Sequence, residues 1–378
     1  MKKVFMFVNV DWFFLSHRLP IARAAYKNNI EMSVYTDFTN NNELHNDEEF
    51  GLFQSPISRS SKYFGLAVVE FIKTFFLILK KKPDLIHAVT IKPIILLGVI
   101  ARLTRTPFLG AISGLGPVLN QLNWFHKLRF KLVLLAYKFI YSPNSASVIC
   151  QSEHDKQLLL NFRVSAESKI LIIPGSGVDL DKFKPNTSKK SKRNILMASR
   201  MLLDKGIKEF CSAAKHFNSY GKSDVKFKLA GPIDELSPTS ISEKDLRSLC
   251  QDSEVEYLGN RSDLNVLLAS ASIFILPSYY PEGVPKVLLE ASACGIPIIT
   301  TDHPGCRDVV VDKETGILVE PRNFEAITIA ISRMLDDPDN LVKMGKAGRK
   351  LAEDSFDERN VVEAHFKIYH QNTEVTSH

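Results

Sequence analysis

The stretch that decides the fold is Leu276–Val310, LPSYYPEGVPKVLLEASACGIPIITTDHPGCRDVV. An apolar run ends at Leu276, and a loop rich in proline and glycine follows it. Pro285 and Gly295 then stand where a helix begins and ends. A second apolar run, Ile296–Thr301, comes next. The pattern predicts a strand–helix–strand unit whose polar residues gather at the carboxyl ends of parallel strands, where open α/β sheets bind ligands.

Two carboxylates belong to this unit: Glu282 in the loop before the helix, and Glu290 inside the helix. Because the first N–H groups of a helix have no acceptor within it, we expect the backbone N–H groups of Gly283 and Val284, at the start of the helix, to form a seat for an anion. The alternative is a Lys286–Glu290 pair, four residues apart on a solvated helix face. That alternative gives no reason for Glu282 or for the glycine and proline pattern, so we favour a ligand site.

The stretch resembles the donor-sugar motif of the family 4 retaining glycosyltransferases, which have the two-domain GT-B fold. The matching positions are Glu282-Gly283, Pro285, Val287-Leu288-Leu289-Glu290-Ala291, Gly295-Ile296-Pro297 and Pro304-Gly305. The resemblance implies that Glu282 contacts the transferring sugar and that Glu290 contacts the ribose of the nucleotide. It also implies that the donor is bound by Gly283, Val284, Pro285 and Val287.

A length of 378 residues favours two domains. Strand and helix patterns alternate from Val4 onward and again from Ile195 onward, which predicts two doubly wound parallel sheets. The resemblance implies an α/β GT-B fold with two Rossmann-like domains facing each other across a cleft. We expect an acceptor-binding domain at 1–184, a polar basic linker at 185–193 and a nucleotide-sugar domain at 194–355. The last segment, 356–378, is expected to be a helix that returns to the first domain.

The cysteines and the N-terminus bear on the compartment. The five cysteines are scattered and lack a C-x-x-C spacing, so neither a disulfide framework nor a zinc site is predicted. The N-terminal MKKVFMFVNVDWFF has the basic start and apolar run of a weak signal peptide. Because Asp11 interrupts it and no small-residue cleavage site follows, we interpret it as the first buried strand and expect a cytoplasmic protein.

The positive charge is concentrated in Phe50–Cys150, which holds 13 Lys and Arg residues against Glu70 and Asp84. Within it, Tyr63–Lys82 and Trp124–Tyr141 are long apolar segments that carry interior charges, which disfavours membrane spans. Both suit amphipathic helices on an anionic membrane surface, and burial of their apolar faces in the core is the alternative. We expect a peripheral protein on the inner face of the plasma membrane, with no nucleic acid partner.

A cationic pair follows the first strand after the linker. Arg200 and Lys205-Gly206 meet the R-x4-K-G pattern of the resembling family. A guanidinium fork and an ammonium group suit a diphosphate leaving group, and two solvated surface cations are the alternative. No Asp-x-Asp sequence occupies a plausible metal site, since Asp336–Asp339 has the pattern of a helix-end turn. We therefore predict that the protein uses no cofactor and no metal ion, and that Arg200 and Lys205 take the place of the metal ion.

Three further positions are candidates in the first domain. His17 lies in the glycine-free loop Asn9–Arg18, which excludes a G-x-G-x-x-G dinucleotide site there. The resemblance places this loop, and the Ser113-Gly114 turn, on the acceptor side of the reaction centre. It also places a histidine, here His87, beside the transferring sugar at a strand's carboxyl end. Purely structural roles stay open for both histidines. The predicted catalytic residues are thus Glu282, His87, Arg200 and Lys205.

The resemblance implies transfer of a sugar, a hexose or an N-acetylhexosamine, from a nucleoside diphosphate to a polyprenyl-diphosphate-linked glycan. UDP is the expected nucleotide, and GDP stays open. The sequence is similar in style to bacterial transferases of lipopolysaccharide, capsule or protein N-glycan assembly, including the type that adds N-acetylgalactosamine to undecaprenyl-linked bacillosamine. The alternatives are a UDP-sugar 2-epimerase on the same fold and a silent nucleotide-sugar binding protein.

Overall fold

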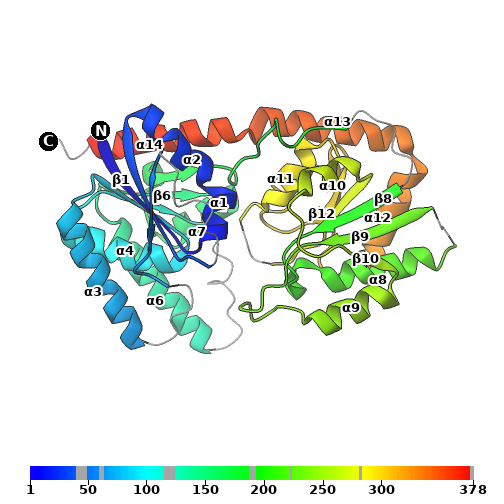
Figure 1. The fold of residues 1–378 in the computed structure, drawn as a ribbon, viewed down its shortest axis with the longest axis horizontal. Coiled ribbons are helices and arrows are strands. Elements are labelled where there is room, and N and C mark those ends of the chain that lie inside the picture. The colour runs from blue at the N-terminus through cyan, green and yellow to red at the C-terminus, as the bar shows by residue number, and fades with distance from the viewer. Residues whose placement is uncertain are drawn as a thin grey trace. The chain divides into compact units, whose positions relative to one another are not determined.

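The computed structural model describes residues 1–39, 49–58, 64–114, 124–186, 193–221, 224–280 and 283–374. Glu282, a predicted catalytic residue, and most of the expected linker lie outside these ranges. The chain divides into two compact units (Figure 1). The first comprises Met1–Ser176 and Glu358–His378, and the second comprises Gly177–Asp357.

The first unit is built on a seven-stranded parallel sheet in the order β3-β2-β1-β4-β5-β6-β7. Its strands are β1 (Lys2–Val8), β2 (Ile30–Thr36), β3 (Gly51–Gln54), β4 (Leu85–Val89), β5 (Phe108–Ala111), β6 (Ala146–Cys150) and β7 (Ile170–Ile172). Its helices include α1 (Asp11–His17), α2 (Leu19–Ala24), α3 (Phe64–Lys81), α4 (Ile91–Thr104), α6 (Trp124–Tyr141), α7 (Glu153–Asn161) and α14 (Glu358–Glu374).

Alternating residues of β1 show how this sheet buries both faces. Phe5 and Phe7 belong to a core formed with α3, α4 and α6. Val4, Met6 and Val8 belong to a second core formed with α1, α2 and α14. Such a division follows from the two-residue side-chain period of a strand. Helix α14 lies beside α2 (Figure 1), so the last helix returns to the first unit as the resemblance implied.

The second unit has a six-stranded parallel sheet in the order β10-β9-β8-β11-β12-β13. Its strands are β8 (Arg193–Ala198), β9 (Val225–Ala230), β10 (Val255–Tyr257), β11 (Ile273–Leu276), β12 (Ile298–Thr301) and β13 (Gly316–Val319). Its helices include α8 (Ile207–Asn218), α9 (Glu243–Asp252), α10 (Leu264–Ser270), α11 (Lys286–Ala293), α12 (Phe324–Asp336) and α13 (Pro338–Ser355).

The division between the units falls after Ser176, earlier than the expected boundary at 184. The reason is packing, because Val178, Leu180 and Phe183 are buried in the core of the second unit. Gly177, the first residue of that unit, has a positive φ of 71°, which glycine adopts at little cost.

The two long apolar segments form α3 and α6, and α6 has the predicted bounds Trp124–Tyr141. Among the described residues, no helix is long and apolar enough to cross a membrane.

Candidate active site

The strand order of the second unit places the candidate residues at its topological switch point. The chain runs from β8 outward through β9 to β10, then returns to β11 on the other side of β8. Arg200 and Lys205 follow β8, and the segment leading into α11 follows β11. Because neighbouring parallel strands end at the same edge, the structure brings these two loops together where α/β sheets bind ligands.

Hydrogen bonds join the two loops directly. The Tyr279 N–H donates to the Asp204 carbonyl at 2.9 Å, and the Tyr279 hydroxyl donates to the Leu203 carbonyl at 3.0 Å. Gly206 has a φ of 81°, and a Cβ there would collide with the Pro277 carbonyl. The loop after β8 is therefore held closely against the loop after β11, which fixes the backbone around Lys205.

The two predicted cations are held in different ways. Lys205 is only 6% exposed, and its Nζ lies 5.1 Å from the centre of the Tyr280 ring. The Arg200 Nη1 donates to the Asp234 Oδ2 at 2.7 Å. Burial and an ion pair distinguish this pair from two solvated surface cations. Both residues follow β8, at the same edge of the sheet.

Asp234 was missed by the sequence reasoning. It follows β9. The end of β9 lies close to the loop after β8, as shown at Gly231, where an added Cβ would collide with the Ser199 carbonyl. An acidic residue shortly after a strand end, beside a candidate phosphate-binding loop, is the signal that could have identified it.

Helix α11 begins one residue later than predicted, since Pro285 is its N-cap and Lys286 its first residue. The helix ends as predicted, with Gly295 at a φ of 64°. Gly283, Val284 and Pro285 are buried, and Val287 is half-buried.

Glu290 is only 8% exposed, so it does not lie on a solvated helix face. Burial raises the pKa of its carboxyl group to about 7, although Lys286 and Lys182 oppose the shift. Burial of a charged carboxylate is costly, and hydrogen bonds from the hydroxyl groups of a ligand would reduce that cost.

The structure corrects the expected position of His87. The residue lies in the middle of β4, paired with Met6 of β1, and not at the carboxyl end of the strand. It is fully buried, and its Nδ1 lies 2.8 Å from the hydroxyl of Tyr369 in α14. Because it shares a strand face with Leu85 and Val89, its side chain points into the core beneath α14. This position supports the structural role and not contact with a sugar.

His87 belongs to a buried polar cluster with Arg18, His365 and Tyr369, which the sequence reasoning missed. The His87 and His365 rings lie 5.8 Å apart. Burial, with the charges of His365 and Arg18, holds the pKa of His87 well below its usual value. Burial and then Arg18 lower the pKa of His365 to about 3, so both rings are neutral at pH 7. Arg18 shows no ion pair with a described carboxylate.

The acceptor-side candidates lie at the carboxyl edge of the first sheet. His17 ends α1 after β1, half-buried, with its ring stacked on Phe13 at 4.1 Å. Ser113 and Gly114 follow β5, and Gly114 has a φ of 104°. The order of this sheet reverses between β1 and β4, so His17 lies near its switch point and Ser113 lies one strand away.

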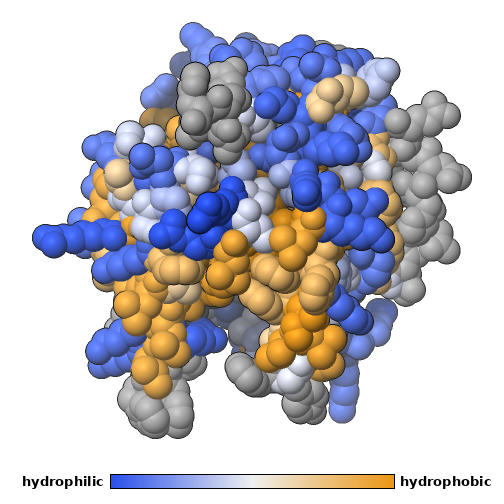
Figure 2. Space-filling model, turned by 90° about the vertical axis from the view of Figure 1, so that its left-hand side faces the viewer, coloured by the Kyte–Doolittle hydropathy of each residue, from blue (hydrophilic) through white to orange (hydrophobic). Residues whose placement is uncertain are grey.

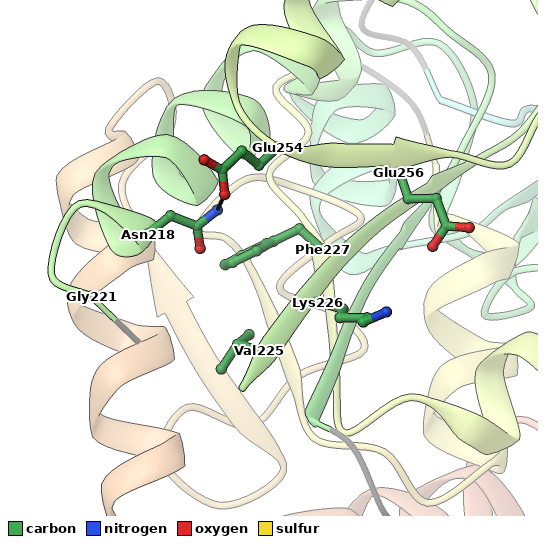
Figure 3. A pocket seen from close by; sticks show the side chains of 7 residues that line it. All are labelled: Asn218, Gly221, Val225, Lys226, Phe227, Glu254 and Glu256. Carbon is green, nitrogen blue, oxygen red and sulfur yellow. Dashed lines mark hydrogen bonds between the residues drawn. The ribbon is translucent and has the colours of Figure 1, made fainter. Parts of the chain in front are cut away.

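A cavity of about 390 Å³ in the second unit lies elsewhere (Figure 3). Its lining residues are Asn218, Gly221, Val225, Lys226, Phe227, Glu254 and Glu256. Because Val225 begins β9 and Glu254 immediately precedes β10, the cavity opens at the amino edge of the sheet, opposite the candidate site. Asn218 donates to Glu254 across its wall at 3.3 Å.

Two family models match the chain, and together they span both units. The model for Glycosyltransferase Family 4 matches residues 19–182, and the model for Glycosyl transferases group 1 matches residues 179–351. The chain belongs to the family 4 glycosyltransferases. This membership agrees with the donor motif of residues 282–305.

Three known proteins show the extent of the similarity. The N,N'-diacetylbacillosaminyl-diphospho-undecaprenol alpha-1,3-N-acetylgalactosaminyltransferase of Campylobacter jejuni is 31% identical over 66% of this chain and 63% of its own length. The UDP-Gal:alpha-D-GlcNAc-diphosphoundecaprenol alpha-1,3-galactosyltransferase of Escherichia coli is 27% identical over 70% of each chain. Sucrose-phosphate synthase from Thermosynechococcus elongatus is 21% identical, with a TM-score of 0.82 over 100% of both chains. The fold is therefore GT-B, with two Rossmann-like units.

Proposed function

We propose that this protein is a retaining glycosyltransferase that moves a sugar, a hexose or an N-acetylhexosamine, from a UDP-sugar to a polyprenyl-diphosphate-linked glycan. The observation that carries the proposal is that Arg200 and Lys205 follow β8, and the helix with the buried Glu290 follows the neighbouring β11, at one topological switch point. These groups suit the diphosphate and the ribose of a nucleotide sugar, and family membership supports retention of configuration.

The proposed roles follow from the charges that the reaction creates. The bond between the anomeric carbon and the β-phosphate oxygen breaks, UDP leaves, and an acceptor hydroxyl oxygen bonds to that carbon and loses its proton. Arg200 and Lys205 stabilise the charge that grows on the leaving phosphate. Glu290 accepts hydrogen bonds from the ribose hydroxyls, and Glu282, outside the described residues, is assigned to the sugar hydroxyls.

UDP and a lipid-linked acceptor are proposed from the relatives. The Escherichia coli relative is named for UDP-Gal, and both curated relatives are named for diphospho-undecaprenol acceptors. Neither is an epimerase, so we favour transfer over the epimerase alternative. We also propose that no metal ion is needed, because the side chains of Arg200 and Lys205 supply positive charge where a divalent cation would otherwise stand.

A lipid acceptor requires contact with a membrane, and α3 and α6 support such contact. Helix α3 turns Glu70 inward, where it pairs with Lys92 at 2.9 Å, and turns most of its apolar residues outward. The exposed apolar residues of the two helices are Leu66, Val68, Val69, Ile72, Phe76, Leu79, Leu128, Leu132, Leu135 and Phe139. Phe76 and Leu135 are each 63% exposed.

Figure 2, which looks at the left-hand side of Figure 1, shows apolar side chains gathered in the lower part of this face, the side on which α3 and α6 lie. Exposed lysines such as Lys73 and Lys131 lie on the same helices. An apolar surface with basic residues suits peripheral binding to an anionic bilayer. We therefore propose that the protein works on the inner face of the plasma membrane.

The test is a transfer assay with a panel of UDP- and GDP-sugars and a short-chain polyprenyl-diphosphate-linked saccharide. We expect a glycosylated lipid with the anomeric configuration of the donor, determined from proton coupling constants. Release of the free 2-epimer from a UDP-sugar without acceptor, or a product of inverted configuration, would overturn the proposal.

A further inference from the structure

A small cavity lies on the first unit, at the sheet edge opposite His17 and Ser113. Its volume is about 90 Å³. It is lined by Gly98, Ala101, Arg102, Arg105, Thr106, Phe108, Ile140, Pro143, Ser145 and Ala146. These residues come from the end of α4, the end of α6 and the starts of β5 and β6. The cavity therefore opens at the amino edge of the sheet.

The floor of the cavity is apolar and its rim is cationic. Ala101, Phe108 and Ile140 are buried beneath it, while Arg102 and Arg105 are exposed. Gly98 allows α4 and α6 to approach, because a Cβ there would lie 2.6 Å from the Ile140 side chain. An apolar floor below two guanidinium groups is suited to a ligand that is both anionic and partly apolar.

The two arginines lack acidic partners in the part of the chain that the structure describes. Neither forms an ion pair with a described carboxylate, and Asp84 is the only acidic residue between positions 71 and 152. The Arg102 guanidinium lies 5.4 Å from the centre of the Phe139 ring, within the range of a cation–π contact. Arg105 occupies the C-cap position of α4 with a φ of 55°. Paired guanidinium groups are the side chains best suited to bind a phosphate through several hydrogen bonds.

The surroundings indicate which phosphate. Phe139 and Leu103, the chain neighbours of the lining residues Ile140 and Arg102, are exposed by 47% and 58%. Phe139 is also the last member of the exposed apolar stripe of α6, which begins at Leu128. A cavity that joins a phosphate-binding rim to an exposed apolar stripe fits an amphiphile better than a free ion.

We propose that this cavity binds the phosphate of an anionic phospholipid. Arg102 and Arg105 hold the phosphate, and the glycerol and first acyl carbons lie against Phe139 and Leu103. The inference rests on the membrane contact proposed above and adds a defined headgroup site to it. The site would anchor the first unit to the bilayer at its amino edge, away from the edge where the reaction is expected.

The experiment compares two double variants that remove the same charge. Arg102→Gln/Arg105→Gln empties the rim, and Lys80→Gln/Lys81→Gln removes two exposed cations at the end of α3 that do not line the cavity. The probe is dihexanoylphosphatidylglycerol, titrated as a monomer and followed by calorimetry. We expect saturable binding to the wild type and the lysine variant, and affinity lower by about tenfold or more in the arginine variant, the usual effect of losing a charge-assisted hydrogen bond.

Further arms separate the possible outcomes. Inorganic phosphate should bind much more weakly than the short-chain lipid, and equal binding would show a free-anion site and overturn the proposal. Equal lipid affinity in the two double variants would also overturn it. Co-sedimentation with phosphatidylglycerol vesicles tests the wider membrane proposal separately, because failure there leaves the monomer titration unaffected. Thermal unfolding and transfer to a short-chain acceptor should be unchanged in the arginine variant, which confirms that it is folded.

Discussion

Replacement of Glu290 by Gln tests the donor site most directly. In the free protein, burial raises the pKa of this carboxyl group to about 7. Ribose hydroxyls donate hydrogen bonds, so they bind the ionised carboxylate better than the protonated acid. UDP binding should therefore lower this pKa and release a proton. The ionised fraction of Glu290 falls from about 0.9 at pH 8 to about 0.1 at pH 6, so UDP affinity should fall about tenfold between these values.

The assay is calorimetric titration of UDP at pH 6, 7 and 8, in two buffers with different enthalpies of ionisation. Wild-type protein should release a proton near pH 7, seen as a difference in apparent enthalpy between the buffers. Glu290→Gln should bind UDP more weakly at pH 8 by about 1–3 kcal/mol, the value of a charge-assisted hydrogen bond.

Two controls isolate the effect. UDP has a phosphate that itself titrates at about pH 6. This contribution is common to all variants, so the difference between wild type and Glu290→Gln reports the glutamate. Glu325→Gln, an exposed residue in the first turn of α12, loses the same charge and should bind as the wild type does. If the wild type and Glu290→Gln show the same pH dependence and the same affinity, Glu290 does not contact the nucleotide.

Other predictions follow from the same structure. Arg200→Ala and Lys205→Ala should each lower turnover by about 10² or more without unfolding the protein, since each removes a preorganised charge at the leaving phosphate; near-normal turnover in both would exclude the phosphate role. Turnover should persist in excess EDTA, and loss that Mn²⁺ reverses would disprove metal independence. The pKa values of His87 and His365 are lowered in the folded state. The stability that these residues give is therefore complete above the unfolded value of about 6.5 and declines below it, by up to about 1.4 kcal/mol per pH unit for each ring. Urea unfolding of the wild type and His365→Gln between pH 7.5 and 5 should show a shallower pH dependence in the variant.

Local sequence signals were sufficient for much of the fold. The bounds of α6 were predicted because its apolar periodicity runs uninterrupted from Trp124 to Tyr141. Gly295 ended α11 as expected because few other residues adopt its positive φ at low cost. The alternation of strands and helices was likewise predicted from local patterns. The return of the last helix was expected from the family resemblance.

The sequence could not supply contacts between distant segments. From the sequence, His87 was expected at the end of a strand and beside a ligand. Its actual partner, Tyr369 of α14, is 282 residues away, so the buried contact could not be predicted from neighbouring residues. The raised pKa of Glu290 and the pairing of Arg200 with Asp234 also depend on tertiary packing. The inward orientation of Glu70 in α3 is a further case, because its partner Lys92 comes from α4. In each case the residue type was visible in the sequence, and its environment was not.

The return of α14 to the first unit has a consequence for synthesis on the ribosome. Val361, Phe366 and Tyr369 complete a core whose other members, such as Met6, are made at the start of the chain. At about 5–20 residues per second, roughly 15–55 s separate the synthesis of His87 from that of Tyr369. Until α14 is made, one face of the first sheet lacks the residues of that helix, whereas the second unit is complete as soon as Asp357 has been added. The nascent chain should therefore complete its second half first, and its N-terminal half should be the part that chaperones hold.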